Sequence, residues 1–256
     1  MKNIIFPSVY DIKLAEFTGC LLGDGYIGEQ YEISVTENSK LDVNHSFYVY
    51  RLIKNLFGIN SSIFVSKKRN AIRCKIYSKP IQEFLVDKLN LVKGNKVKNR
   101  RLKIPRLYFK DRKYLKACLR GLFDTDGCFC RHRISEPMIE IDSLNNRLRN
   151  SILEALKILN FSVSYSGRKI YIYSAYDIKR FFNEIGSNNT RNMIKYEFWL
   201  NNNIVPKTNQ IKVINKKILT KLRNSISKDW VKLDIKDLYG FGLKIDTCAD
   251  SLVART

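Results

Sequence analysis

The stretch LRGLFDTDG, at residues 119–127, has a second copy far upstream in FTGCLLGDG, at residues 17–25. Each copy is a short, mostly apolar run with a glycine in its middle and Asp-Gly at its end. The two central glycines, Gly19 and Gly121, and the two terminal aspartates, Asp24 and Asp126, share one offset of 102 residues. A repeated segment at a fixed offset indicates an internal duplication, and 256 residues suffice for two domains.

The composition points to a polyanionic partner. The chain has 46 Lys and Arg residues against 24 Asp and Glu residues, a net charge of +22. An excess of this size favours nucleic acid binding through counterion release, and a general solubility charge is the alternative. No apolar run reaches the roughly 18 residues of a membrane span, so we expect no membrane partner. The six cysteines form no CxxC pair, which indicates reduced thiols in an intracellular protein, cytoplasmic in a prokaryote or within an organelle.

The order of predicted elements is the same in both halves. The first half predicts helices over residues 12–23, 41–57 and 80–90, with hairpins over 26–36 and 62–78 between them. The second half predicts helices over 114–125, 145–159 and 175–185, with strands at 127–133, 138–142, 161–165 and 169–174, and a last helix ending near residue 200. Each half is therefore an αββαββα unit of the α+β class, with a four-stranded antiparallel sheet.

Two prolines mark the domain boundaries. Ile104-Pro105 and Val205-Pro206 follow the repeats, so we place an N-terminal domain at 1–105 and a C-terminal domain at 106–206. Residues 207–256 form a basic C-terminal extension without a counterpart in either repeat. We expect a helix over residues 214–225 of this extension, and the sequence indicates no specific role for it.

Small residues recur at every fourth position of each motif helix. They are Ala15, Gly19 and Gly23 in the first copy, and Ala117, Gly121 and Thr125 in the second. Four residues make about one helical turn, so each set forms a stripe that lets two helix backbones approach closely. We therefore expect the two helices to pack on each other about a pseudo-twofold axis.

This packing would bring Asp24 and Asp126 together at two helix C-termini. A carboxylate there meets the negative end of the helix dipole, and the second carboxylate adds repulsion. A bound divalent cation reverses both penalties, so we predict a metal site that also includes Gly23 and Thr125. Simple Asp-Gly turns are the alternative. Asp124 has no acidic counterpart, because Leu22 takes its place, and we expect it to be structural or capping.

The paired segments resemble the LAGLIDADG motif, and the arrangement over residues 10–206 is similar to a single-chain, two-repeat LAGLIDADG homing endonuclease. The first copy departs from the motif at Cys20 and Leu22 but keeps its glycines and Asp24. The resemblance implies two sheets forming a DNA-binding saddle, and site-specific hydrolysis of both DNA strands. It also implies Mg²⁺ held by Asp24 and Asp126, with Mn²⁺ or Ca²⁺ able to substitute for binding. We expect an intron-encoded monomer with no obligatory protein partner.

The same resemblance implies a basic residue near each scissile phosphate. Gly94-Asn95-Lys96, leading to Ile104-Pro105, resembles the family's G-x-K…I-P pattern and makes Lys96 the first candidate. The second half reads Gly186-Ser187-Asn188, so Arg191 is the nearest basic replacement. Plain phosphate contact is the alternative for both. The two histidines, His45 and His132, form no nuclease-like cluster, and we expect them at the surface or in the groove.

Polar side chains that alternate with aliphatic ones on the strands are candidates for reading the DNA major groove. In the first half they are Tyr26, Gln30, Ser34, Thr36, Lys67, Arg69, Arg73, Lys75 and Tyr77. In the second half they are Arg131, Arg133, Glu140, Asp142, Arg168, Lys169, Tyr171 and Tyr173. An ordinary exposed sheet face is the alternative for any single residue. The halves differ at most of these positions, which predicts an asymmetric target.

Two other functions compete with the nuclease. A LAGLIDADG-derived RNA maturase or an inert DNA-binding regulator would use the same fold. Retention of both Asp24 and Asp126 argues against the inert regulator, whereas maturase activity could coexist with cleavage. An intein is disfavoured, because the chain opens with Met1-Lys2 and ends with Arg255-Thr256, without splicing residues at either end.

Overall fold

The computed structural model describes residues 4–66, 68–133, 136–214, 230–233 and 242–245. The first half contains α1 (Ile12–Leu22), β1 (Gly25–Ile27), β2 (Glu32–Asn38), α2 (Val43–Phe57), β3 (Ser62–Ser66), β4 (Ala71–Tyr77) and α3 (Lys79–Leu89). The second half contains the 3₁₀ helix η1 (Arg106–Lys110), α4 (Arg112–Asp126), β5 (Gly127–Arg133), β6 (Glu136–Asp142), α5 (Asn146–Ile158), β7 (Ser164–Ser166), β8 (Lys169–Ile172), α6 (Ala175–Glu184) and α7 (Thr190–Asn202).

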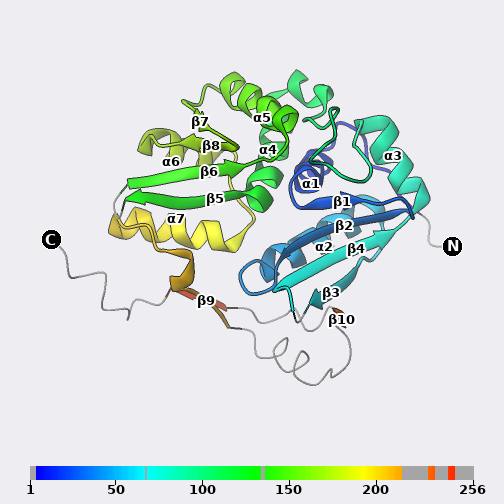
Figure 1. Ribbon diagram of the computed structural model, residues 1–256, viewed down its shortest axis with the longest axis horizontal. Helices are drawn as coiled ribbons and strands as arrows, with labels where there is room; N and C mark the ends of the chain where they lie inside the picture. Colours follow the sequence, from blue (N-terminus) through cyan, green and yellow to red (C-terminus); the bar gives the residue numbers. More distant parts are fainter. Residues whose placement is uncertain (1–3, 67, 134–135, 215–229, 234–241, 246–256) are drawn as a thin grey trace.

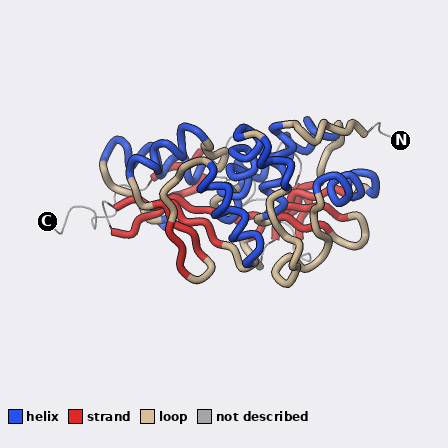
Figure 2. The backbone as a smooth tube through the Cα atoms, turned by 90° about the horizontal axis from the view of Figure 1, so that it is seen from above, coloured by secondary structure: helices blue, strands red, loops and turns tan. Residues whose placement is uncertain are grey.

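The two halves share one sheet topology. The strand order is β1-β2-β4-β3 in the first half and β5-β6-β8-β7 in the second, and all neighbouring strands are antiparallel. Most helices gather on one side of the molecule and both sheets lie on the other (Figure 2). The α+β fold with two αββαββα repeats, expected from the sequence, is confirmed.

Strand β4 shows why these segments form half-buried sheets. Ile72, Cys74 and Ile76 are buried, while the residues between them are partly or fully exposed. A period of two places every second side chain on the face that packs against the helices. The helices follow the period of 3.6, and α2, for example, buries Val49 and Leu52 on one stripe before Gly58 ends it at a φ of 70°.

The C-terminal extension reaches back to the first half. After the 3₁₀ helix η2 (Thr208–Gln210), strand β9 (Ile211–Ile214) pairs with β11 (Gly242–Ile245). Strand β10 (Trp230–Leu233) pairs antiparallel with β3 and becomes the fifth strand of the first sheet. Of the helix expected over 214–225, Ile214 is instead the last residue of β9, and the rest lies outside the described residues.

Helices α1 and α4 form the seam between the halves, at the centre of the molecule (Figure 1). A Cβ atom added to Gly19 would collide with the carbonyl oxygen of Cys118 and lie 2.8 Å from the amide nitrogen of Leu122. A Cβ atom added to Gly121 would collide in the same way with the backbone of α1, 2.8 Å from the amide nitrogen of Cys20. The helix backbones are therefore in direct contact at both glycines.

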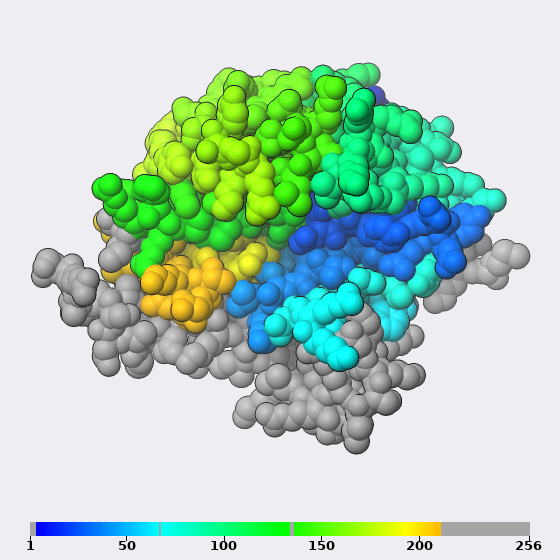
Figure 3. Space-filling model, in the orientation of Figure 1, coloured from blue at the N-terminus to red at the C-terminus, as the bar shows by residue number. Residues whose placement is uncertain are grey.

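The two halves meet along a continuous boundary, with no open gap in the space-filling view (Figure 3). Within the described ranges, no helix has the length and apolar character needed to cross a membrane.

Candidate active site

The two motif helices end beside each other. A Cβ atom on Gly23 would collide with the hydroxyl of Thr125 and lie 3.3 Å from the carboxyl carbon of Asp126. The Thr125 hydroxyl donates to the carbonyl oxygens of Gly121 and Leu122, at 2.9 and 3.1 Å, so it is turned toward its own helix. The structure therefore brings Gly23, Thr125 and Asp126 together at the carboxyl end of the seam, with Asp24 next in the chain.

The carboxyl groups of Asp24 and Asp126 disfavour each other's ionisation. Two effects raise the pKa of Asp24 to about 8: desolvation by the surrounding protein and, second, the charge of the Asp126 carboxylate. Because Asp24 is exposed to solvent, repulsion by the Asp126 carboxylate is the main physical cause. Burial raises the pKa of Asp126 to about 6, against the opposing effect of Lys96. The pair therefore carries negative charge that a cation would stabilise.

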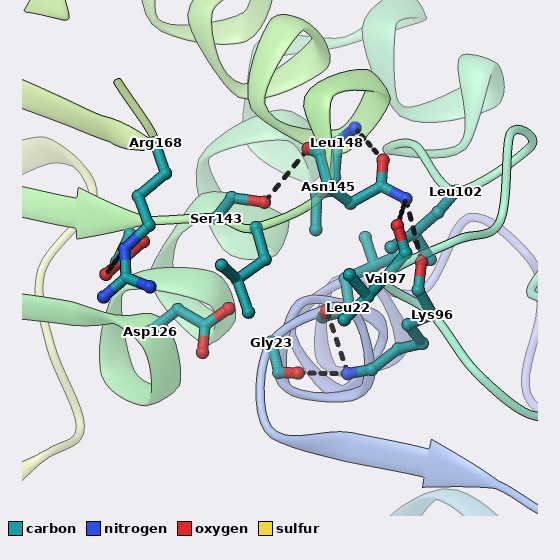
Figure 4. Close-up of a pocket in the computed structure, with 12 residues that line it drawn as sticks. Leu22, Gly23, Lys96, Val97, Leu102, Asp126, Ser143, Asn145, Leu148 and Arg168 are labelled. Carbon is teal, nitrogen blue, oxygen red and sulfur yellow. Dashed lines mark hydrogen bonds and ion pairs between the residues drawn. The ribbon is translucent and has the colours of Figure 1, made fainter. Parts of the chain in front are cut away.

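Lys96 lies at this same end of the seam. Its ammonium donates hydrogen bonds to the last carbonyl oxygens of α1, at 3.2 Å to Leu21 and 3.1 Å to Leu22, and also to that of Gly23 (Figure 4). Burial lowers the pKa of Lys96, and the charges of Asp126 and Asp24 partly offset this effect. A cation at a helix C-terminus interacts favourably with the helix dipole. Lys96 therefore both caps α1 and compensates the two carboxylates.

A pocket of about 320 Å³ opens beside these groups. Asp126, Lys96 and Gly23 line it together with Asp142 and Arg168 (Figure 4). Arg168 and Asp142 form an ion pair with 2.9 Å between Nε and Oδ2. The pocket thus joins the end of the seam to the face of the second sheet.

Arg191, the second candidate basic residue, is paired with a carboxylate of the first half. Its guanidinium pairs with Asp42, the residue that precedes α2, with 3.3 Å between Nε and Oδ1. A catalytic role for Arg191 stays a prediction. Asn188 corresponds to Lys96, since each is the second residue after a glycine of similar positive φ, Gly186 at 75° and Gly94 at 74°.

The end of α4 is capped by a neutral side chain. Asn189 Nδ2 donates to the carbonyl oxygen of Asp124 at 2.9 Å, whereas the ammonium of Lys96 serves the end of α1. The C-terminal ends of α1 and α4 have similar backbones, but a cationic side chain caps α1 and a neutral one caps α4.

The donor set at the seam fits a divalent cation of the Mg²⁺ type. The described residues contain no group of three or more His, Cys, Asp or Glu side chains arranged around one metal position. Mg²⁺, however, is commonly held by one or two carboxylates, with water and substrate phosphates completing its shell. Asp24 and Asp126 supply the two carboxylates, and their raised pKa values show that their charges are not fully compensated by the protein.

The candidate DNA-reading residues lie mostly on one face of each sheet. Thr36 pairs with Arg73 across β2 and β4, and Asp142 pairs with Lys169 at the matching place of β6 and β8. Exposed or partly exposed side chains belong to Tyr26, Gln30, Thr36, Arg69, Arg73, Lys75, Tyr77, Arg131, Arg133, Glu140, Asp142, Arg168, Lys169, Tyr171 and Tyr173. Lys67 lies outside the described residues.

Ser34 is the exception among these candidates. Its side chain is 2% exposed, and its hydroxyl donates to Glu32 at 2.9 Å. It pairs across the sheet with Lys75 and Tyr26, so it belongs to the expected face but is covered by its neighbours. Direct base contact by Ser34 is therefore not supported.

The expectation for His45 is wrong. This residue is fully buried between Glu37 and Asp124, whereas His132 is exposed as expected. The position of His45 in the third place of α2 matches that of Leu148 in α5, which is buried. Comparison of the two repeats could have indicated a buried site.

A second groove, of about 1180 Å³, runs along the flank of the molecule between α3, the segment 90–106 and α5. The exposed cations that line it are Lys93, Arg100, Arg101, Lys103, Arg106 and Arg147. They face two acidic residues, Asp87 and Glu154. The groove is therefore a predominantly basic surface.

Comparisons with known proteins find a family domain in the second half of the chain. The family model of the LAGLIDADG-like domain matches residues 113–186. Two DNA polymerases, from Thermococcus hydrothermalis and Thermococcus sp. (strain GE8), are 29% and 30% identical over 160 residues, or 60% of this chain. The match spans only 9% of the length of each polymerase.

Solved structures with the same arrangement include full-length DUF199/WhiA from Thermatoga maritima. It has a TM-score of 0.50 and 17% identity, covering 79% of this chain and 65% of that one. The homing endonuclease I-DmoI in complex with DNA and Mn has a TM-score of 0.48 and 14% identity, covering 69% of this chain and 98% of that one. Residues 113–186 thus match the LAGLIDADG-like domain, and both halves of the chain have the αββαββα architecture.

Proposed function

We propose that this protein is a divalent-metal-dependent endonuclease that cuts both strands of a long, asymmetric DNA site. The observation that carries the proposal is the meeting of Gly23, Thr125 and Asp126 at the end of the seam, with Asp24 adjacent. This site lies between two sheets of the same topology, in a chain with a net charge of +22. Carboxylates placed between two basic surfaces suit phosphodiester hydrolysis, which requires charge stabilisation at phosphorus.

Asp24 and Asp126 would hold the cation, with the Gly23 carbonyl oxygen nearby as a third oxygen. When bound, Mg²⁺ supplies a Lewis acid at the scissile phosphate and acidifies a water molecule. Mn²⁺ would replace it in cleavage, and Ca²⁺ would support binding. Lys96 would polarise the phosphate or organise the water after leaving the α1 carbonyl oxygens. The proposed roles therefore fall to Asp24, Asp126, Gly23 and Lys96, which lie at the same end of the seam.

The two sheets would hold the DNA. Their matching rows place Arg73 and Lys75 on β4 and Lys169 and Tyr171 on β8 at equivalent positions. Cations on this face would contact phosphates, and polar groups would read base edges. Because the rows differ in sequence, the two half-sites would differ as well. We further propose that the protein acts as an intracellular, intron-encoded monomer.

Cleavage of a randomised DNA library in the presence of Mg²⁺ tests the proposal and identifies the target. Asp24→Asn and Asp126→Asn should each abolish double-strand cleavage while DNA binding persists. Asp87→Asn, the same substitution at an exposed site on α3, serves as the matched control and should cut like the unmodified chain. Normal cleavage by either seam variant would refute the two-carboxylate site.

One observation favours a second function, a DNA-binding protein without nuclease activity. The ammonium of Lys96 already bonds to the carbonyl oxygen of Gly23, and the described residues include no group of three His, Cys, Asp or Glu side chains that could hold a metal ion. On this alternative, Lys96 replaces the metal instead of assisting it. Sequence-specific DNA binding without cleavage in either Mg²⁺ or Mn²⁺ would support this alternative and exclude the nuclease.

A further inference from the structure

The seam between the halves has a buried ion pair on one of its two sides. His45 of α2 and Asp124 of α4 are both fully buried, with 3.6 Å between Nε2 and Oδ2. His45 Nδ1 is hydrogen-bonded to Glu37 of β2 on its other side. Burial alone would lower the pKa of His45, but Glu37 and Asp124 raise it well above its ordinary value. His45 therefore bridges the two halves in the interior, between the carboxylates of Glu37 and Asp124.

The other side of the seam is apolar at the same positions. Leu22 takes the place of Asp124 in the first motif, and Leu148 takes the place of His45 in the helix that follows the first hairpin of its half. Both leucines are at most 2% exposed and line the pocket beside Asp126. The equivalent positions of the two halves thus hold hydrocarbon side chains on one side of the seam and ionisable side chains on the other.

Asp124 is held by a segment of its own half as well. It accepts hydrogen bonds from the hydroxyl of Ser187 and, at 2.8 Å, from the amide of Asn188. Its backbone carbonyl oxygen accepts from Asn189 at 2.9 Å. The residue two places before Asp126 is therefore fixed by the neighbouring loop and by the other half of the molecule.

A second buried carboxylate extends the contact. Glu16 of α1, 2% exposed, accepts hydrogen bonds from Arg120 at 2.7 Å, Asn188 at 2.6 Å and Tyr48 at 2.8 Å. Arg120 and Asn188 belong to the second half, and Tyr48 and Glu16 to the first. This side of the seam is thus a connected polar network that crosses the boundary at several points.

Stability alone does not account for this network. An apolar pair of similar size is often as stabilising as a buried ion pair, or more so, because both charges must be desolvated. The leucine pair on the opposite side shows that this fold accepts the apolar solution. The hydrogen bonds that Glu16 accepts from Arg120 and Asn188 have a different property, since they are directional and are satisfied in one relative placement of the two halves and lost in others.

We propose that His45 and Asp124 are positioning residues, which fix the docking of the two halves and so set the spacing of Asp24 and Asp126. The contact between His45 and Asp124 is linked to the carboxylates of both Asp24 and Asp126. Asp124 precedes Asp126 by two residues, and Glu37, the partner of His45, is close enough to Asp24 to act on its charge. This inference builds on the proposed nuclease, because its purpose is to hold the two metal-binding carboxylates.

Asp124→Asn is the variant that tests it, and Asp177→Asn is the matched control. Asp177 is also a buried aspartate, 4% exposed, but it accepts hydrogen bonds from Ser162 and Arg180 within its own half. Per folded molecule, Asp124→Asn should slow cleavage about 10–100-fold and raise the Mn²⁺ concentration at half-saturation by a similar factor. The DNA dissociation constant should hardly change. Asp177→Asn should lose stability without either effect.

The Mn²⁺ midpoint is read from the shift in thermal unfolding, so it does not depend on cleavage. A chain that never cuts DNA, yet binds Mn²⁺ more tightly than Asp124→Asn, would refute the nuclease and leave the positioning role standing. Equal Mn²⁺ midpoints in Asp124→Asn and the unmodified chain would overturn the positioning role. If Asp124→Asn does not fold, His45→Gln, which can still bond to Glu37, gives the same test with the same outcomes.

Discussion

The ammonium nitrogen of Lys96 lies 3.1 Å from the carbonyl oxygen of Leu22, at the end of the helix that leads directly into Asp24. The ammonium thus compensates a helix end and two carboxylates at once, and its own pKa responds to both Asp126 and Asp24. In the second half the corresponding residue is the neutral Asn188, which bonds to Glu16. The side chains that cap the ends of α1 and α4 therefore differ in charge. We expect the two DNA strands to be cleaved at different rates as a result.

Lys96→Met should slow cleavage about 100-fold while weakening DNA binding only slightly, because it removes a preorganised charge at the reacting phosphate. The substitution keeps most of the hydrocarbon stem. Single-turnover cleavage and equilibrium binding of the same DNA site measure the two effects separately. Lys98→Met, at an exposed position two residues further on, is the control. If Lys96→Met lowers the cleavage rate and the DNA affinity equally, Lys96 only contacts a phosphate and has no catalytic role.

Gly121→Ala should destabilise the protein by roughly 1–3 kcal/mol, because the new Cβ atom would collide with backbone and not with an adaptable side chain. Chemical denaturation measures this loss. The same change at Gly167, in an exposed turn with open space around it, tests the cost of its positive φ of 57° alone, about 1–2 kcal/mol. DNA cleavage per folded molecule should fall only for Gly121→Ala. A tolerated alanine at Gly121 would contradict the direct contact of α1 and α4.

The metal-free protein should lose stability as the pH rises through the range in which Asp24 ionises. The pKa of Asp24 is about 8 in the folded chain against an ordinary value of 3.8, so the folded state holds its proton longer than the unfolded state. The resulting stabilisation is complete below about pH 4 and is lost by about pH 8. Because Asp24 is exposed, solvent screening should keep the change modest.

Thermal unfolding of the unmodified chain and of Asp24→Asn, across this pH range without divalent ions, checks the sign. Asp24→Asn should become the more stable of the two as the pH rises, since it removes one of the repelling charges. Added Mg²⁺ should stabilise the unmodified chain most at the upper end of the range. A pH-independent difference between the two proteins would mean that Asp24 and Asp126 do not sense each other.

Local patterns in the sequence were sufficient for the repeated fold and for the central seam. The spacing of small residues through Gly19 and Gly121 predicted a close helix pair, because a four-residue period fixes one face of a helix. The burial of His45 was missed, because a histidine has no fixed place on a hydropathy scale, and only its match to Leu148 reveals its surroundings.

Other features depend on contacts between distant parts of the chain. Arg191 follows the polar loop after α6, and its guanidinium pairs with Asp42 in the first half. Likewise, nothing in the sequence near Trp230 indicates that β10 pairs with β3. In both cases the partner is chosen by the docking of the two halves or of the extension, which local periodicity does not describe.

The ion pair between Glu140 and Lys169 should restrain DNA binding by the second sheet. The two side chains are 2.7 Å apart, from Oε1 to Nζ, on the face expected to meet DNA. Glu140→Gln removes a negative charge from this face and frees Lys169 for a phosphate. Affinity for nonspecific DNA should therefore increase, and the slope of log K against log salt should steepen by about 0.9 for each additional phosphate contact.

A salt titration of binding to target and nonspecific DNA distinguishes this effect from a change in base reading. The matched control is Glu154→Gln, which also removes a glutamate paired with a basic residue, Arg106, but on α5 and away from both sheets. It should leave the slope unchanged if the DNA lies on the sheets. An equal change in both variants would show that overall charge decides the affinity, whereas an effect confined to Glu140→Gln locates the DNA on the face that carries Lys169.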